Sequence, residues 1–260
     1  MKIAIFAGGR GTRLLGEEAP MPKALFEVGG RPILWHIMQM YMAHGMNDFV
    51  MLLGYRGDLI ANWFINHAPY AGSNLRVSGG GDHEPSVEVL DQNCRTPWNV
   101  TLCPTGVDTE KGERLRKASK FLSTEPNFMA TYGDGLSDID LKKLAAFHES
   151  HGKLATVTAV RVNSQWGHLG LDNTGAVREL IEKPPMDAWV NGGFFVLRKE
   201  ALEFLEPGDT FESNCLPRLA AAGELMAYRH EGFWTAMDTY KDNLLLNELW
   251  ESGKAPWGHE

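Results

Sequence analysis

The sequence predicts a Rossmann-like α/β protein, in which helices flank a mixed, mostly parallel sheet and a smaller α+β region completes the molecule. Three observations support this fold. Short apolar runs at 3–7 and 48–54 stop at a glycine, as strands buried on both faces of a parallel sheet do. Segments with apolar residues at helical spacing alternate with these runs. The 260 residues, 43% of them apolar and 22% charged, suffice for one full core.

The first seventy residues alternate between strands and helices. The strand at 3–7 is followed by a helix over 33–43, with Pro32 at its first position and glycine just beyond its end. The strand at 48–54 is followed by a helix over 58–66, with Asp58 as its N-cap. This order is typical of a β-α-β-α unit.

The alternation breaks down between residues 70 and 96, which are rich in Gly, Ser, Asp and Asn and carry strand-like runs only at 75–78 and 87–90. We expect an irregular excursion over the sheet here. Periodicity then returns, and it predicts strands at 99–102, 128–132 and 155–160 and helices at 112–121 and 139–151.

The order of elements changes beyond residue 165. Strand-like segments at 168–172, 176–181 and 192–197 are mixed with helical patterns at 199–204, 214–222 and 241–250. No linker or repeat separates the two halves. The sequence therefore predicts a soft boundary between 1–165 and 166–260 inside one compact body.

Charge and cysteine content exclude several classes of protein. Twenty-five basic residues against 33 acidic ones give a net charge of −8, which argues against nucleic acid as a partner. The three cysteines include no C-x-x-C pair, so neither a disulfide framework nor a cysteine zinc site is expected. With no signal peptide and no run long enough to span a bilayer, we expect a cytoplasmic protein without a membrane partner.

The segment after the first strand is the strongest candidate for anion binding. Residues 7–14 read AGGRGTRL, and closely spaced glycines let backbone N–H groups converge on a phosphate. Leu14 stands where a dinucleotide fingerprint has its third glycine, which disfavours an NAD-dependent oxidoreductase. Glu17 and Glu18 replace the Lys and Ser/Thr of a P-loop. A glycine-rich turn required by geometry alone stays an alternative.

Two cations accompany this glycine loop. Arg13 lies within it, and Lys23 follows ten residues later, behind the stiff Pro22. Together they suit the charge of a triphosphate, whereas either one alone is better explained as a solvated surface residue.

Two aspartates are candidates for a Mg²⁺ site. Asp134 lies between glycines directly after the strand at 128–132, at the sheet edge where α/β proteins bind ligands. Asp238 follows the aromatic pair Phe233 and Trp234. A carboxylate is a hard oxygen ligand that suits Mg²⁺ shared with phosphate oxygens, but one carboxylate rarely suffices, so a second is expected. Each aspartate alone is more often a turn or capping residue, so the prediction depends on the pair and the glycine loop together.

Polar side chains also occur at 182–191. Glu182 and Lys183 end one strand-like run, and Asn191 opens the next. An acid, a lysine and an amide at adjacent strand ends suit sugar hydroxyls and a second phosphate. A hairpin turn with a local salt bridge is the alternative.

Taken together, these motifs resemble one family, the sugar-1-phosphate nucleotidylyltransferases. The superfamily motifs are AGGxGTRL from residue 7, PK at 22–23, GDG at 133–135, EKP at 182–184 and NGG at 191–193. Resemblance to the cytidylyl branch is carried by PILWHIM from 32, PWNVTL from 97, MDT from 237 and GKAPW from 253. The similarity spans nearly the whole chain.

The resemblance implies a reaction and its partners. CTP and α-D-glucose 1-phosphate would give CDP-glucose and pyrophosphate with Mg²⁺, by in-line attack of the sugar phosphate on the α-phosphorus. Residues 1–165 would bind the nucleotide, and residues 166–260 would bind the sugar phosphate and supply C-terminal helices. The resemblance also implies a homo-oligomer.

The family's functional positions transfer to this chain by motif. The nucleotide would be contacted by Ala7, Gly8, Gly9, Gly11, Thr12, Arg13, Lys23, Thr109, Arg114 and Gly133. Arg13, Lys23 and Lys183 would be the catalytic cations, Glu182, Lys183 and Asn191 would bind the sugar phosphate, and Asp134 and Asp238 would hold the metal.

The chain also departs from the family pattern. Ala24 stands where members often have a second proline after the loop lysine, and Asn214 and Cys215 replace an acid and a proline. An acid that contacts sugar hydroxyls discriminates strongly between acceptors, so these changes bear on the acceptor more than on the chemistry. The same chemistry with another nucleotide or acceptor, and a nucleotide-binding regulatory module without turnover, stay as alternatives.

Overall fold

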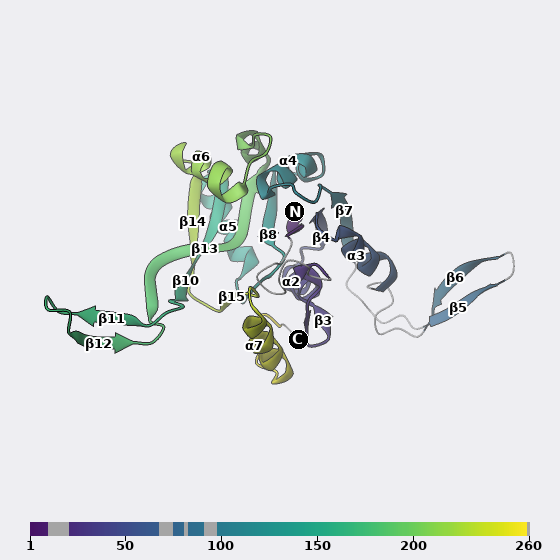
Figure 1. Ribbon diagram of the computed structural model, residues 1–260. Coiled ribbons are helices and arrows are strands. Elements are labelled where there is room, and N and C mark those ends of the chain that lie inside the picture. The colour runs from purple at the N-terminus through teal and green to yellow at the C-terminus, as the bar shows by residue number, and fades with distance from the viewer. Residues whose placement is uncertain (10–20, 68–74, 81–82, 91–97, 259–260) are drawn as a thin grey trace.

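In the computed structural model, the described residues are 1–9, 21–67, 75–80, 83–90 and 98–258 (Figure 1). A seven-stranded sheet with the order β14-β10-β13-β8-β1-β4-β7 forms the centre. Its strands are β1 Lys2–Ala7, β4 Asp48–Leu53, β7 Asn99–Pro104, β8 Asn127–Tyr132, β10 Ala155–Asn163, β13 Pro185–Arg198 and β14 Leu225–His230. β13 runs antiparallel to both neighbours, and the other pairings are parallel. The predicted mixed, mostly parallel sheet is confirmed.

Both faces of the central strands β1, β4 and β8 are buried, which explains why these strands are mostly apolar. Along β1, Ile3 and Ile5 belong to a core cluster shared with α2 Ile33–Ala43 and α5 Leu141–His151. Ala4 and Phe6 point the other way, into a cluster shared with α4 Lys111–Leu122 and α6 Leu216–Ala221. The side chains of β1 therefore alternate between two helical layers.

Smaller elements surround the sheet. They are the 3-10 turns Lys23–Leu25 and Lys199–Phe204, β2 Glu27–Val28, β3 Arg31–Pro32, α3 Gly57–Asn62, the π-turns Trp63–His67 and Phe211–Cys215, β9 Gly135–Ser137, β15 Trp234–Ala236 and α7 Tyr240–Glu251. Two antiparallel ribbons, β5 Leu75–Gly80 with β6 His83–Val89 and β11 His168–Leu171 with β12 Val177–Ile181, project from opposite sides of the body (Figure 1). No helix among the described residues is long and apolar enough to cross a bilayer.

Three local expectations need correction. The strand-like runs near 75 and 90 form a regular ribbon that extends away from the sheet, not an irregular excursion over it (Figure 1). The N-cap of α3 is Arg56 in a left-handed conformation (φ 49°), and Asp58 lies in the first helical turn, where its charge favours the helix N-terminus. Pro32 is itself the N-cap of α2.

A buried histidine connects the N-terminal helix layer to the C-terminal segment. The Nε2–H of His36 donates to Val28 O (2.8 Å), and its Nδ1 accepts from Trp257 Nε1 (3.3 Å). Both rings are almost fully buried. This pattern requires the neutral imidazole, and burial lowers the pKa of His36 from 6.5 to about 4.

We expect His36 to make the protein less stable in mild acid. The folded-state pKa is depressed, so its contribution is complete above pH 6.5 and is lost as the pH falls from 6.5 to about 4. Over this range the free energy of unfolding should fall by on the order of 3 kcal/mol. Urea unfolding of wild type and His36→Gln across this range tests it, and the variant should lose less stability per pH unit. If the stabilities of wild type and His36→Gln fell in parallel with pH, this role of His36 would be contradicted.

Candidate active site

A cavity of about 570 Å³ lies beyond the carboxyl ends of β1 and β8, the edge where α/β sheets bind ligands. Segments that are far apart in the sequence line it. The lining residues are Phe6, Ala7, Gly8, Gly9, Lys23, Ala24, Thr109, Glu110, Lys111, Arg114, Tyr132, Gly133, Asp134, Asn191, Glu212, Trp234, Ala236 and Asp238.

Lys23 joins the two predicted carboxylates at one point of this cavity. Its Nζ donates to Asp134 Oδ2 (2.8 Å) and to Asp238 Oδ1 (2.7 Å). The lysine side chain is only 13% exposed, against 27% and 44% for the aspartates. Two acids 104 positions apart therefore share one ammonium group, and the predicted convergence of their side chains is present in the structure.

A short ribbon explains how these aspartates meet. β9 directly follows Asp134 and pairs antiparallel with β15, which ends two residues before Asp238. Gly135 faces Ala236, and Met237 N donates to Asp134 O (2.9 Å). Antiparallel pairing places the start of one strand beside the end of the other, so both carboxylates lie at the same end of the ribbon.

Lys23 is held by its own turn. Pro22 caps a 3-10 turn that begins at Lys23, and Ala24 and Leu25 are buried in the core. Ala24, the position at which the chain departs from the family's proline, is thus a packed core residue that also lines the cavity.

Arg114 anchors the glycine loop to the sheet. Its guanidinium is 4% exposed and donates to the carbonyls of Gly8 (3.2 Å), Leu53 (3.0 Å) and Gly106 (2.7 Å), among others. A Cβ on Gly8 would lie 2.5 Å from this guanidinium, so only glycine permits the approach. Burial lowers the pKa of Arg114. The side chain fixes the ends of β1, β4 and β7 relative to one another.

We expect Arg114→Met to lower the free energy of unfolding by about 2–4 kcal/mol, because it leaves several buried carbonyls without a donor. Urea unfolding measures this change. The control Arg178→Met removes an arginine that is 72% exposed on the β12 ribbon, and should cost less than about 1 kcal/mol. Equal losses in the two variants would contradict the anchoring role.

The other predicted site residues fall into three groups. Ala7, Gly8, Gly9, Thr109, Gly133 and Asn191 line the cavity with Lys23, Arg114 and the two aspartates. Gly11, Thr12 and Arg13 lie outside the described residues. Glu182 and Lys183 do not line the cavity.

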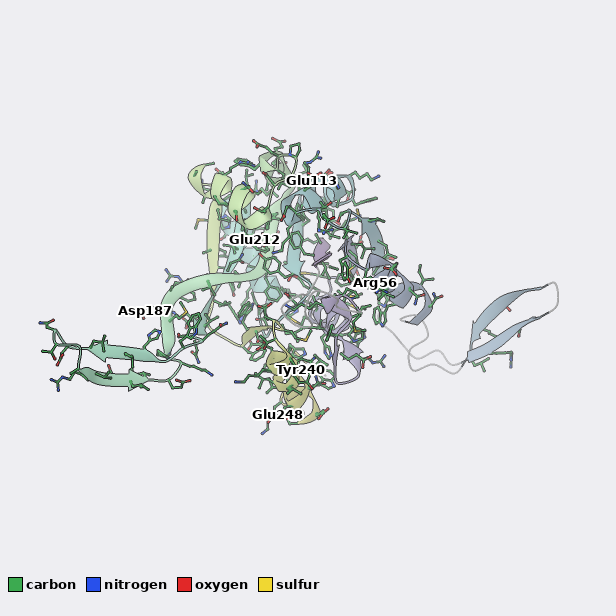
Figure 2. All side chains as sticks on the ribbon, in the orientation of Figure 1. Arg56, Glu113, Asp187, Glu212, Tyr240 and Glu248 are labelled. Atoms are coloured by element: carbon green, nitrogen blue, oxygen red, sulfur yellow. The ribbon has the colours of Figure 1, made fainter. Side chains whose placement is uncertain are left out.

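The course of β13 explains the position of Glu182 and Lys183. We expected one strand to end near Glu182 and another to open near Asn191, but β13 already begins at Pro185, and Asn191 lies in its middle. The strand bends from the body toward the β11–β12 ribbon, and Asp187 lies on that bend (Figure 2). Lys183 lies beyond the bend, where its side chain is 47% exposed and its Nζ lies 3.9 Å from Glu182 Oε1.

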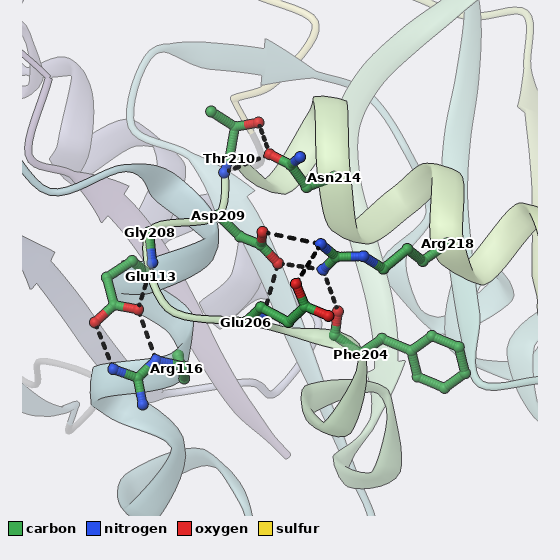
Figure 3. Close-up of polar contacts among 9 residues, drawn as sticks. All are labelled: Glu113, Arg116, Phe204, Glu206, Gly208, Asp209, Thr210, Asn214 and Arg218. Atoms are coloured by element: carbon green, nitrogen blue, oxygen red, sulfur yellow. Dashed lines mark hydrogen bonds and ion pairs between the residues drawn. The ribbon is translucent and has the colours of Figure 1, made fainter.

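The sequence did not single out three lining residues, Lys111, Tyr132 and Glu212. Tyr132 directly precedes the GDG motif, and Glu212 lies in the segment noted for its departures at Asn214 and Cys215. Asn214 accepts two hydrogen bonds from Thr210 and does not line the cavity (Figure 3). Tyr132 and Glu212 could have been identified as site residues from the sequence only through their places in these motifs.

The carboxylate pair fits a magnesium ion. No group of three or more His, Cys, Asp or Glu side chains that could hold a metal occurs among the described residues. Asp134 and Asp238 supply two oxygen ligands at one place in the cavity. Mg²⁺ is commonly bound in this way, by one or two carboxylates together with the phosphates of a substrate.

A mixed sheet with two glycines directly after β1, and a lysine and two carboxylates that meet in a cavity at the carboxyl ends of its strands, is typical of an α/β protein that binds a phosphorylated ligand. Comparison with known proteins identifies the family to which this α/β protein belongs. The family model described as "Nucleotidyl transferase" matches residues 2–247. The chain belongs to the nucleotidyl transferase family.

Two relatives are similar over almost their whole length. Glucose-1-phosphate cytidylyltransferase of Salmonella typhimurium is 44% identical, covering 99% of this chain and 98% of the relative. Probable glucose-1-phosphate cytidylyltransferase of Bacillus subtilis is 41% identical over 99% of both chains. Among solved structures, HddC from Yersinia pseudotuberculosis superposes with a TM-score of 0.70 at 20% identity, covering 96% of this chain and 99% of HddC, and supports the fold.

Proposed function

We propose that this enzyme transfers the cytidylyl group of CTP to α-D-glucose 1-phosphate, giving CDP-glucose and pyrophosphate. The observation that carries the proposal is the contact of Lys23 with both Asp134 and Asp238 inside the cavity. Relatives named as glucose-1-phosphate cytidylyltransferases, at 41–44% identity over nearly the full chain, support the choice of substrates. Mannose-1-phosphate guanyltransferase of Aspergillus fumigatus is only 27% identical.

The chemistry requires approach and charge neutralisation. A phosphate oxygen of the sugar phosphate forms a bond to the α-phosphorus, and the bond from that phosphorus to the pyrophosphate oxygen breaks. Because the attacking oxygen is already an anion, no general base is needed. The enzyme must instead hold two polyanions in line and stabilise the charge on the transferred phosphorus.

Five of the lining residues and two further cations have a role in this scheme. In this proposal Lys23 donates hydrogen bonds to the phosphates, and the backbone N–H groups of Gly8 and Gly9, two residues that line the cavity, donate further ones. Asp134 and Asp238 would hold Mg²⁺, which would neutralise phosphate charge. Arg13 and, although it does not line the cavity, Lys183 are proposed as further phosphate-binding cations on the family pattern. A net acidic protein binds two anionic substrates because this positive charge is local.

A matrix of nucleoside triphosphates and sugar 1-phosphates tests the proposal. Purified enzyme with Mg²⁺ should release pyrophosphate fastest with CTP and glucose 1-phosphate, and mass spectrometry should detect CDP-glucose. A clear preference for another pair would assign the same chemistry to other substrates. No pyrophosphate release from any pair would contradict an enzymatic role and favour a regulatory module that binds nucleotide.

We also propose a homo-oligomer that works in the cytoplasm. Large apolar side chains on the β11–β12 ribbon support the oligomer, since Leu169, Leu171 and Leu180 are each more than half exposed. Light scattering of the purified protein should give a mass that is a multiple of 28.9 kDa, and a monomer mass would contradict it.

A further inference from the structure

A second polar cluster lines the same cavity and has no role in the proposed chemistry. It consists of Lys111, Tyr132, Asn191 and Glu212, which come from α4, β8, β13 and the π-turn Phe211–Cys215. The Tyr132 hydroxyl donates to Glu212 Oε1 (2.8 Å), and Asn191 Nδ2 donates to the Tyr132 oxygen (3.1 Å). Lys111 Nζ pairs with the same Oε1 and lies 4.6 Å from the centre of the Tyr132 ring.

The tyrosine in this cluster has a fixed orientation. Its ring packs against Phe6 and Phe195, each at 5.8 Å between ring centres. On another side it meets the backbone of Gly193, whose φ is +78° and whose hypothetical Cβ would lie 2.3 Å from the ring. The Tyr132 hydroxyl therefore donates to Glu212 from a preset position.

The segment that carries Glu212 is tied to the start of α4, where Lys111 lies. Glu113 on α4 accepts from Gly208 N (3.3 Å), and Glu113 N donates to Asp209 O (3.0 Å) (Figure 3). Arg218 holds the carboxylate of Asp209 from the other side (Figure 3). These hydrogen bonds therefore hold α4, which carries Lys111, and the segment that carries Glu212 in a fixed relative position.

The charge state of Glu212 follows from its neighbours. Burial alone would raise its pKa, but the hydrogen bond and charge of Lys111, together with the Tyr132 hydroxyl, leave the pKa below its usual value. The carboxylate is therefore ionised at neutral pH. Among the described residues, both side-chain donors contact Oε1, and no side-chain donor contacts Oε2.

This cluster suits a neutral ligand group that carries hydroxyls. The Glu212 carboxylate would repel a phosphate, and its pairing with Lys111 leaves the cluster without net charge. Oε2 can accept a hydrogen bond from an O–H donor, and Trp234, which lines the same cavity, offers apolar contact for a sugar ring.

From this geometry, and on the basis of the proposed function, we infer that Glu212 is a specificity-determining residue that accepts a hydrogen bond from a saccharide hydroxyl. Lys111 is a positioning residue that keeps Glu212 aimed at the ligand. Both substrates carry such hydroxyls, the pyranose of the sugar phosphate and the ribose of the nucleotide. An analogue that lacks the hydroxyl would leave the Glu212 acceptor unpaired, and wild type should reject it.

Single-deoxy substrates test the role of Glu212. We expect wild type to turn over at least one of the 2-, 3-, 4- and 6-deoxy glucose 1-phosphates, or 2′-deoxy CTP, with kcat/KM lowered about 10- to 100-fold. In Glu212→Ala the ratio of kcat/KM between the natural and that deoxy substrate should shrink to less than about threefold, because the carboxylate that accepts the hydrogen bond is gone. If kcat/KM falls only with a deoxy sugar phosphate, the hydroxyl that contacts Glu212 belongs to the sugar phosphate. If it falls only with 2′-deoxy CTP, that hydroxyl belongs to the ribose.

Controls separate this inference from folding and from the proposed function. Glu203→Ala removes an exposed acid outside the cavity and should keep the wild-type preferences. Glu212→Met keeps most of the side-chain volume but removes the acceptor, so it gives the same test if the alanine variant is unstable. Wild type that makes no CDP-glucose would refute the proposed function. An active wild type whose preferences all persist in both Glu212 variants would overturn the inference alone.

A double-mutant cycle tests the role of Lys111. Lys111→Met should raise the KM of the substrate whose hydroxyl contacts Glu212 about 5- to 10-fold while kcat stays within about twofold. In the Glu212→Ala background the same substitution should change KM by less than about twofold, because Lys111 acts through Glu212. A fall in kcat, or full additivity, would contradict the positioning role.

Discussion

Asp134→Asn should lower kcat by about 100-fold or more and change the free energy of unfolding by less than about 1 kcal/mol. Asparagine keeps the size of the side chain but removes one of the two carboxylate charges that meet at Lys23. Lys23 keeps its ion pair with Asp238 in this variant, so no charge is left without a partner and the fold should lose little stability. Pyrophosphate release at saturating substrates measures kcat, and urea unfolding measures stability.

Asp187→Asn is the matched control for this prediction. Asp187 lies on the bend of β13 outside the cavity, so the same change of charge there should leave kcat within about twofold (Figure 2). If Asp134→Asn kept wild-type kcat, Asp134 would have no role in the reaction.

Lys23→Met should have two effects of opposite sign. Turnover should fall about 100-fold or more, because the phosphates lose a charged donor in the cavity. Without nucleotide, however, Mn²⁺ should bind about tenfold more tightly, because the ammonium no longer competes for Asp134 and Asp238. Steady-state kinetics and titration calorimetry measure the two effects.

Lys142→Met, on the exposed face of α5, is the control and should change neither quantity. Loss of turnover with unchanged Mn²⁺ affinity would mean that the contact of Lys23 with the carboxylates does not limit cation binding. Unchanged turnover would remove Lys23 from the reaction.

The sheet could be predicted because its signal is local. Burial on both faces makes β1 and β4 apolar at every position after their first residues, Lys2 and Asp48, and the glycine that follows each run marks its end. The extent of β13 could not be predicted in this way. Its first four residues, from Pro185, are exposed and show no alternation of buried and exposed positions, and pairing with β10 makes them a strand.

The candidate site was predicted where a motif marks it. Asp134 and Asp238 stand out because each follows a strand or an aromatic pair, and the β9–β15 ribbon brings them together. The anchoring role of Arg114 depends on carbonyls from three strand ends, which no spacing in the sequence encodes. The Lys111–Glu212 pair spans 101 positions and likewise becomes visible only in three dimensions.

The most direct test of the shared carboxylate site is a Mn²⁺ titration in the presence of a non-hydrolysable CTP analogue, followed by electron paramagnetic resonance. Wild type should bind one ion per chain in the cavity, and Asp134→Asn and Asp238→Asn should each abolish that same ion. An ion that persists at full affinity in either variant would show that the two aspartates do not act on one cation, contrary to the arrangement around Lys23.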